Sequence, residues 1–253
     1  MSYLFIKYLT GLNYIRVKNG IKNIIDISKK AKLRNSKIKI TGKNNEIVIK
    51  DGSLLRGCDI KIVGDGNKII INENVTLNNL NIIFDNEGQV INIGKGTNMA
   101  RGMIVSLEKY PIIIGEDCNI SYDVEIRNTD SHMIFDKNTK KRVNYGNAVT
   151  IGNHVWLGTR TMILKGSNIG TGSVIGACSV VSGNIPSNVI AIGIPATIKK
   201  TNIFWTRDEV MERKKWRKNF YIYMMNLNIH GLEKTMEWFQ YICQRFVDTI
   251  VIF

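Results

Sequence analysis

The segment from Ile151 to Ile185 reads IGNHVWLGTRTMILKGSNIGTGSVIGACSVVSGNI and repeats a pattern every six residues. An aliphatic residue opens each repeat, Gly usually follows it, and the fifth position is small or β-branched. A helical period of about 3.6 residues cannot keep the aliphatic residues on one face, so the pattern excludes a helix. The aliphatic positions are Ile151, Leu157, Ile163, Ile169, Ile175 and Val181.

Such a repeat is typical of a coil made of three short strands. The aliphatic residues point inward and stack on their equivalents in the next coil. The small residue fits a tight corner, and Gly supplies a backbone conformation that other residues resist. Because one coil cannot bury its own apolar face, the coils must form a continuous stack. We expect neighbouring coils to lie about 4.8 Å apart, the usual spacing of strands.

Longer coils of the same kind precede this segment. Within them the six-residue rule predicts further inward residues, among them Ile83 and Val105. After Ile126 the rule breaks, and residues 127–148 form a polar excursion without a repeat. A long irregular loop on a rigid scaffold is often functional. The equivalent inward residues that mark the successive coils are Ile49, Ile71, Ile93, Ile114 and Ile151.

The pattern predicts an all-β solenoid, a parallel β-helix over residues 20–200 with a protruding loop at 127–148. For residues 1–19 we expect an N-terminal segment containing a helix. Residues 201–253 are rich in Trp and Met, and their spacing predicts a helical C-terminal extension. Capping of the open end of the solenoid is the favoured role for this extension. Oligomer contacts and contact with a membrane surface remain alternatives.

The composition bounds the class of protein. An apolar fraction of 44% excludes a disordered chain. No run reaches the roughly 18 apolar residues of a membrane span, and we expect no secretory signal. The cysteines show no paired spacing, so we expect them reduced and mostly buried, as in a cytoplasmic protein. They are Cys58, Cys118, Cys178 and Cys243.

The net charge of +14 is concentrated at the N-terminal end, where residues 1–50 hold twelve Lys or Arg against Asp26 and Glu46. A basic end of this kind suits an acidic polysaccharide or the inner face of an anionic membrane, to which the protein would bind peripherally. An ordinary soluble surface is an equal alternative. We expect no nucleic acid partner, because the basic residues are not interleaved with aromatic ones.

Three histidines are the first candidates for chemistry: His132, His154 and His230. His132 lies in the excursion near Asp130, which could orient it. His154 lies inside a repeat, and for His230 we expect a structural role. The histidines lack zinc-ligand spacing and no Cys cluster accompanies them, so we expect no metal. Nucleotide-binding glycine motifs and a nucleophile elbow are also absent from the sequence.

The run from Ile151, with Gly193-Ile-Pro-Ala after it, resembles the hexapeptide-repeat acetyltransferases, which form a left-handed β-helix. The segment Glu125-Ile-Arg-Asn-Thr-Asp-Ser-His, with Asn144-Tyr-Gly, is similar to bacterial capsular polysaccharide O-acetyltransferases, including those acting on polysialic acid. The resemblance covers about residues 20–200. It implies the left hand of the coil, a homotrimer with active sites between subunits, and acetyl-CoA as co-substrate.

The resemblance also implies roles for single residues, with His132 as the catalytic base. Trp156 would wall the thioester end of the site, and Lys200 would lie near the nucleotide phosphates of the cofactor. Ile194 and Thr197 depart from the family pattern around Pro-Ala. The implied cofactor-binding residues are Trp156, Thr159, Lys165, Ala177, Ser182 and Lys200. The implied substrate-binding residues are Trp156, Asp130, Asn128 and Tyr145.

The resulting hypothesis is direct O-acetyl transfer to a hydroxyl of a surface polysaccharide or its sugar units, with a sialylated or other acidic glycan, or a neutral one, as acceptor. Imidazole suits a general base because it takes up and releases a proton near neutral pH. The excursion residues Lys140, Lys141 and Arg142 are expected to help attract an anionic acceptor. A sugar N-acetyltransferase, a non-catalytic β-helix scaffold and a zinc-dependent hydratase are the alternatives.

Overall fold

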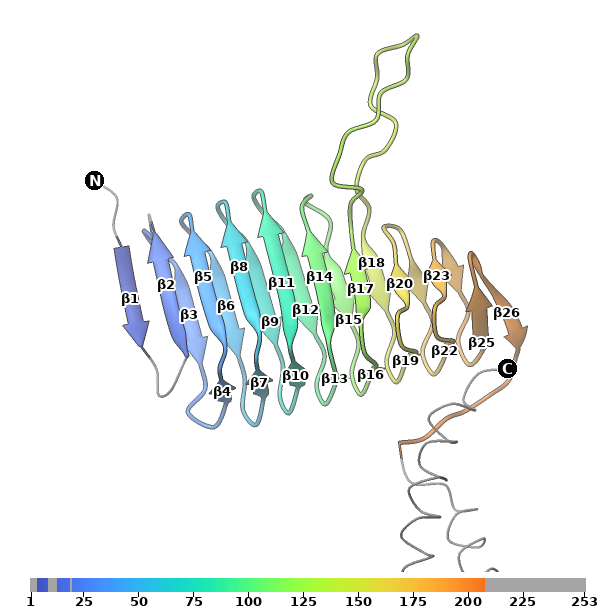
Figure 1. Ribbon diagram of the computed structural model, residues 1–253, viewed down its shortest axis with the longest axis horizontal. Coiled ribbons are helices and arrows are strands. Elements are labelled where there is room, and N and C mark those ends of the chain that lie inside the picture. Colours follow the sequence, from blue (N-terminus) through green and yellow to red (C-terminus); the bar gives the residue numbers. More distant parts are fainter. Residues whose placement is uncertain (1–3, 9–12, 19, 208–253) are drawn as a thin grey trace, which may run out of the picture. The chain divides into compact units, whose positions relative to one another are not determined.

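The computed structural model describes residues 4–8, 13–18 and 20–207, and this part of the chain contains strands, turns and loops but no helix (Figure 1). Three sheets form the sides of a parallel β-helix of the left-handed type. The chain divides into two compact units, Met1–Ile203 and Phe204–Phe253. The β-helix is the first of these units.

Each coil gives one strand to each sheet, and the sheets are named A, B and C here. Sheet A has the order β1 (Leu4–Tyr8), β2 (Tyr14–Lys18), β5 (Lys37–Thr41), β8 (Asp59–Val63), β11 (Leu80–Asp85), β14 (Gly102–Ser106), β17 (Val124–Arg127), β20 (Met162–Ile163) and β23 (Val180–Val181). Sheet B has the order β3 (Ile24–Ile27), β6 (Glu46–Ile49), β9 (Lys68–Ile71), β12 (Val90–Ile93), β15 (Ile112–Ile114), β18 (Val149–Ile151), β21 (Asn168–Ile169) and β24 (Asn184–Ile185). Sheet C has the order β4 (Lys32–Arg34), β7 (Leu54–Arg56), β10 (Thr76–Asn78), β13 (Asn98–Met99), β16 (Asn119–Ile120), β19 (Trp156–Leu157), β22 (Val174–Ile175), β25 (Ile190–Gly193) and β26 (Ala196–Lys200).

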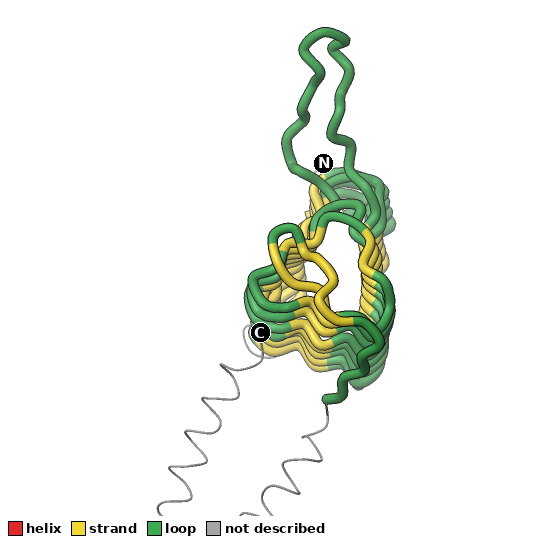
Figure 2. The backbone as a smooth tube through the Cα atoms, turned by 90° about the vertical axis from the view of Figure 1, so that its right-hand side faces the viewer, coloured by secondary structure: helices red, strands yellow, loops and turns green. Residues whose placement is uncertain are grey.

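The aliphatic positions of the repeat form the core, as the sequence predicted. Ile151 pairs with Ile114 of the coil before and with Ile169 of the coil after, and all three are buried. Figure 2 looks along the stack, where the coils superimpose on one another. Burying an isoleucine side chain contributes roughly 1.5–3 kcal/mol, so this column is a main source of stability.

The predicted inward positions of sheet A were wrong by one residue in the longer coils. Ile82 and Ile104 fill the interior and pair with each other, whereas Ile83 and Val105 lie on the outer face of the sheet. The connection from sheet C to sheet A is one residue shorter there than in the regular repeat. Ile82 follows Leu77 by five positions, whereas Ile163 follows Leu157 by six. The additional residues of these coils lie in the connection from sheet A to sheet B, which we call the A–B corner.

The glycines that follow the aliphatic residues are needed for close approach of neighbouring backbones, not for an unusual conformation. A Cβ atom on Gly152 would lie 2.7 Å from the backbone nitrogen of Thr171, and one on Gly158 would lie 2.6 Å from that of Ala177. The left-handed backbone conformation occurs instead at turn residues such as His154, with φ of 52°. The sequence analysis identified the positions correctly but gave the wrong reason.

A ladder of buried amide side chains fixes the A–B corner of the early coils. The side-chain oxygen of Asn45 accepts the backbone N–H of Asn67 at 2.9 Å, and that of Asn67 accepts the N–H of Gln89 at 3.0 Å. The side-chain amide of Asn67 also donates to the backbone oxygen of Asn86 at 2.9 Å. These bonds satisfy backbone groups that the turn leaves without a strand partner.

Replacing Asn67 by alanine is expected to lower the free energy of unfolding by about 2–4 kcal/mol, because it leaves two buried backbone groups unpaired. Urea denaturation followed by circular dichroism measures the change. Asn81→Ala is the matched control, since Asn81 is an exposed residue of β11. Equal unfolding midpoints for the two variants would contradict the role of the ladder.

Antiparallel strands flank the parallel stack at both ends. Strand β1 pairs antiparallel with β2, and β26 pairs antiparallel with β25. The expected helix in residues 1–19 is therefore wrong over Leu4–Tyr8 and Tyr14–Lys18, and the stack begins at β2 and not near Gly20. The expected C-terminal helices and His230 lie outside the described residues.

Candidate active site

The loop of residues 128–148 leaves the stack at the A–B corner, between β17 and β18 (Figures 1 and 2). Its position agrees with the break in the repeat. The two arms meet in a single antiparallel bridge between Phe135 and Arg142, and the carboxylate of Asp136 accepts backbone N–H groups at the turn. The loop thus projects from the scaffold while its base is fixed by three sets of contacts.

The first set joins the loop to Glu108, which lies at the A–B corner of the preceding coil. Arg142 donates to both carboxylate oxygens of Glu108, at 2.6 and 3.3 Å, and the N–H of Gly146 donates to Oε2 at 3.0 Å. Burial of the Glu108 carboxylate opposes its ionisation, but these donors outweigh it, so its pKa is lowered. The guanidinium of Arg142 therefore neutralises Glu108 and fixes the base of the loop, whereas we expected it to help attract an anionic acceptor.

Asn128 provides the second set of contacts and is fully buried. Its amide donates to the backbone oxygens of Glu108 at 2.9 Å and Tyr110 at 2.6 Å, and to the hydroxyl of Ser106 at 3.1 Å. Its side-chain oxygen accepts the N–H of Leu107 at 3.1 Å. The side chain of Asn128, which we expected to bind substrate, is occupied in holding the corner.

Asp130 and Lys165 form the third set, from the side of the following coil. Lys165 Nζ donates to Asp130 Oδ2 at 2.5 Å and to the backbone oxygen of Tyr145 at 3.0 Å. The amide of Asn144 donates to the same carboxylate oxygen at 2.9 Å. The hydrogen bond from Lys165, more than any other contact, lowers the pKa of Asp130. Lys165, which we expected to bind cofactor, is instead engaged at the loop base.

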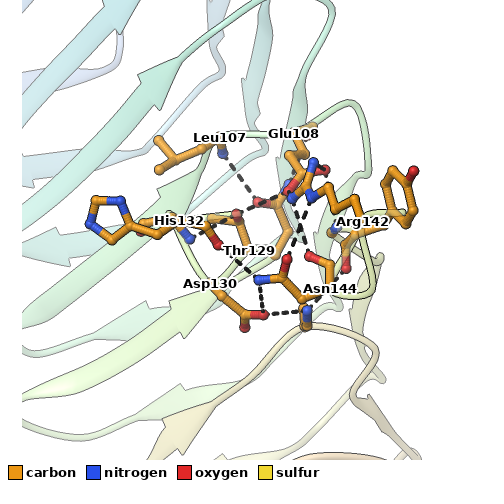
Figure 3. Close-up of polar contacts among 12 residues, drawn as sticks. Leu107, Glu108, Thr129, Asp130, His132, Arg142 and Asn144 are labelled. Atoms are coloured by element: carbon orange, nitrogen blue, oxygen red, sulfur yellow. Dashed lines mark hydrogen bonds and ion pairs between the residues drawn. The ribbon is translucent and has the colours of Figure 1, made fainter. Parts of the chain in front are cut away.

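His132 lies beside these contacts, and only its backbone takes part in them. Its N–H donates to the backbone oxygen of Asp130 at 2.8 Å, and its carbonyl accepts the amide of Asn144 at 2.8 Å. Figure 3 shows the imidazole directed away from the carboxylate of Asp130. The Asp130 carboxylate, which we expected to orient the imidazole, is instead bonded to Lys165 and Asn144, and the side chain of His132 is exposed.

Tyr145 is the remaining predicted residue of the loop, and its ring is 59% exposed. The guanidinium of Arg142 lies 4.9 Å from the ring centroid, a distance at which a cation is attracted to the ring. Tyr145 thus presents an aromatic surface beside the loop base, where a sugar could pack.

The other predicted cofactor residues lie on different parts of the coil. Trp156 is in β19 of sheet C, and Thr159 and Ala177 lie in connections from sheet C to sheet A, where the Thr159 hydroxyl bonds that of Ser121 at 2.9 Å. Ser182 is exposed at the A–B corner, and Lys200 is exposed in β26. Because sheet C faces away from the A–B corner, a single chain does not bring Trp156 to His132.

Sequence reasoning missed Glu108 and Thr129 and used Asn144 only as part of a motif. Thr129 is buried and its hydroxyl donates to Glu108 at 3.2 Å. Glu108 and Arg142 are separated by 34 positions, and no local pattern couples residues at that distance. The sequence offered one hint of these contacts. Each neighbouring coil has a charged residue at the corner where the loop begins, Glu108 in the coil before and Lys165 in the coil after.

Comparisons with known proteins agree with this geometry. Residues 148–183 match the family model described as bacterial transferase hexapeptide (six repeats). Over 120 residues the chain is 42% identical to a polysialic acid O-acetyltransferase of Escherichia coli O1:K1, and the match covers 47% of this chain and 39% of that protein. The matched segment thus spans less than two thirds of this relative's length.

Two solved structures are similar over most of the chain. The polysialic acid-specific acetyltransferase NeuO has a TM-score of 0.73 and 32% identity, covering 84% of this chain and 98% of that one. The polysialic acid O-acetyltransferase OatWY has the same TM-score and identity, covering 80% and 99%. The hexapeptide repeat and the β-helix that the chain shares with these two structures define the class of protein as an acyltransferase. The chain belongs to the hexapeptide-repeat acetyltransferase family. Within that family it is similar to the polysialic acid O-acetyltransferases.

No group of three or more His, Cys, Asp or Glu side chains in the described residues could hold a metal ion. No helix in the same residues is long and apolar enough to cross a membrane.

Proposed function

We propose that the protein is an acetyl-CoA-dependent O-acetyltransferase that modifies hydroxyl groups of a bacterial surface polysaccharide, or of its sugar units, with a sialylated or other acidic glycan as the favoured acceptor. The observation that carries the proposal is the exposed imidazole of His132, held by backbone contacts on a loop that is fixed at its base. The names of the similar proteins support the acceptor class.

In the proposed reaction, His132 accepts the proton of an acceptor hydroxyl while the oxygen attacks the thioester carbonyl. The new C–O bond forms, the tetrahedral centre collapses with cleavage of the C–S bond, and the imidazolium returns its proton to the departing thiolate. A backbone N–H of the rigid coil would stabilise the oxyanion. No acyl-enzyme is required, since the acetyl group passes directly between the two substrates.

The proposed site for acetyl-CoA follows sheet C and its connection to sheet A. Thr159 and Ala177 occupy equivalent, half-exposed positions in successive coils there, and Trp156 lies at the start of the same stretch. The small side chains at these two positions leave room along this stretch for a thin, flexible chain such as pantetheine. Lys200, exposed in β26, would supply positive charge for the phosphates.

This arrangement requires more than one copy of the chain, and we propose the homotrimer that the family resemblance implies. His132 and Trp156 lie on different sides of one coil, so a neighbouring copy would bring its sheet C to the loop. The loop also carries apolar side chains that are 55–64% exposed in the single chain and that a neighbour would cover. They are Met133, Ile134, Phe135 and Val143.

A thiol-release assay with acetyl-CoA tests the proposed activity against sialylated, other acidic and neutral acceptors. We expect CoA release that depends on the acceptor, and a product whose acetyl group is lost in mild base, as an ester is. A base-stable product would instead indicate an N-acetyltransferase. Failure to bind CoA at millimolar concentration would favour a non-catalytic scaffold, and bound zinc would favour a hydratase.

The proposed location is the cytoplasm, at the inner face of the membrane. Cys58 and Cys118 are buried thiols, as is common in a reducing compartment. The basic N-terminal coils would provide the attraction to an anionic surface. Cell fractionation at low and high salt tests this location, because a peripheral protein leaves the membrane fraction when salt is added.

A further inference from the structure

One row of outward-facing positions crosses the outer face of sheet A from its N-terminal coils to the active-site loop. The register of β2, β5, β8, β11, β14 and β17 places one residue of each strand in this row, and these strands lie side by side in Figure 1. The row is Arg16, Lys39, Lys61, Ile83, Val105 and Arg127.

The first three positions of the row are basic and lie in consecutive coils. Arg16 and Lys61 are exposed, and Lys39 is paired with Asp59 at 2.8 Å. Lys37, in the adjacent row, is also exposed. The ion pair with Asp59 offsets the charge of Lys39. The row therefore keeps two exposed cations, Arg16 and Lys61, that are available to an anionic partner.

Arg127 ends the row at the base of the active-site loop, next to Asn128. Its guanidinium forms an ion pair with Glu125 on the same outer face. Its Nε–H is buried and has no hydrogen-bond acceptor in the described part of the chain. A buried guanidinium N–H without an acceptor is unfavourable. The Arg127 side chain as a whole is 27% exposed, so its guanidinium can turn toward a carboxylate that arrives from outside and form a charge-assisted bond with it.

The geometry points to this face, which we call the sheet A row, as the binding path for a polymer that carries repeated carboxylates. The basic end holds the chain electrostatically, the half-exposed Ile83 gives it an apolar contact, and Arg127 binds a carboxylate at the base of the loop that carries His132. At about 4.8 Å per coil, Lys61 lies about 14 Å and Arg16 about 24 Å from Arg127. A long acceptor reaches the basic end and a very short one does not. The inference rests on the proposed function for the role of His132.

A second basic stack on the same coils provides a matched control. Arg34 and Arg56 occupy neighbouring register positions on strands β4 and β7 of sheet C, and Lys32 lies on the same strand as Arg34. These three basic residues match in number the three of the sheet A row. Sheet C does not lead to the A–B corner, where the loop begins. The two sets of basic residues therefore differ in their position relative to the loop and not in their number.

The experiment compares two triple variants in the full-length protein. One is Arg16→Gln/Lys39→Gln/Lys61→Gln, and the other is Lys32→Gln/Arg34→Gln/Arg56→Gln. Binding of long-chain polysialic acid is measured in a His132→Ala background, where the polymer is not modified. We expect the sheet A variant to bind about tenfold more weakly at low salt, and the sheet C variant to bind within about twofold of its parent. Equal losses in both variants, or no loss in the sheet A variant, would overturn the inference.

Kinetics with an intact His132 separate this inference from the proposed function. The sheet A variant should raise KM for the long polymer and leave kcat and KM for a short sialyl oligomer unchanged. If the sheet A variant acetylates the polymer with an unchanged KM, the row does not bind the polymer, and the proposed function still stands. Polymer binding that depends on the row, without acetyl transfer to any acceptor, would refute the proposed function alone.

Arg127 is tested in a charge-balanced pair of variants. Glu125→Gln/Arg127→Gln removes both members of the ion pair and should raise KM for the short acidic oligomer with little change in kcat. Glu125→Gln alone keeps the guanidinium and should not raise that KM. A rise of equal size in both variants would assign the effect to Glu125 and exclude Arg127 as the carboxylate-binding residue.

Discussion

Replacement of His132 by alanine is expected to reduce kcat for acetyl transfer by a factor of about 10² to 10⁴, the usual contribution of a positioned general base. The fold should be unaffected, because only the backbone of His132 is bonded to its surroundings. The imidazole makes no hydrogen bond to the described part of the chain, so its removal leaves no unpaired group.

Thiol release from acetyl-CoA measures this effect, and His132→Gln is the matched variant. Glutamine is close in size and keeps hydrogen-bonding groups but does not accept a proton near neutral pH. Both variants should be equally impaired, with unchanged thermal unfolding. Near-normal turnover in either one would exclude His132 as the base.

The His132→Ala variant also tests whether the active site is shared between two copies of the chain. A Trp156→Ala protein should also be impaired, since Trp156 is proposed to wall the thioester end. If His132 and Trp156 of one site come from different subunits, random exchange of subunits between the two inactive proteins should restore about a quarter of the wild-type activity. Recovery should be absent if each chain supplies both residues of its own site.

Replacement of Asn128 by alanine is expected to lower the free energy of unfolding by about 3–5 kcal/mol, with a loss of activity through misplacement of the loop. The change removes four hydrogen bonds in a fully buried position. It leaves the backbone oxygen of Tyr110 and the N–H of Leu107 without partners, while the oxygen of Glu108 keeps the N–H of Tyr110 at 2.7 Å. Each unpaired buried group costs about 1–3 kcal/mol before relaxation.

Urea denaturation gives the stability of this variant, and hydrogen exchange locates the change. Amide exchange should accelerate in residues 106–110 and 128–148 before the rest of the stack. Asn138→Ala is the control in the same loop, because the side chain of Asn138 is exposed and only its backbone is bonded. A uniform loss of protection across all coils would contradict a local role for Asn128.

The scaffold could be predicted from the sequence because the repeat records the contacts that make it. Each inward aliphatic residue touches its own equivalent one coil away, as Ile151 does with Ile114 and Ile169. The break after Ile126 located the loop for the same reason. Prediction failed at Ile83 and Val105, where the length of a connection, which no hydrophobic count reveals, shifted the inward position by one residue.

The base of the site could not be predicted, because it is built across coils by polar contacts. Lys165 meets Asp130, and Arg142 meets Glu108, only after the stack has placed three A–B corners next to one another. The family resemblance points to the loop as the site and assigns Asn128 and Lys165 to ligands, whereas both side chains are engaged in contacts at the base of the loop. Buried hydrogen bonds and bound ligands favour the same residue types, so sequence alone does not separate the two roles.

The antiparallel strands at the two ends have a consequence for self-association. A stack of parallel coils offers unpaired N–H and C=O groups at its ends, where coils of another molecule could add in the same direction. Strands β1 and β26 reverse the chain direction on sheets A and C. The strands of a further coil would therefore run opposite to the end strands of these two sheets and could not continue the parallel hydrogen-bond pattern. This reversal works against end-to-end growth into fibrils, a hazard common to proteins whose fold has no intrinsic limit to its length.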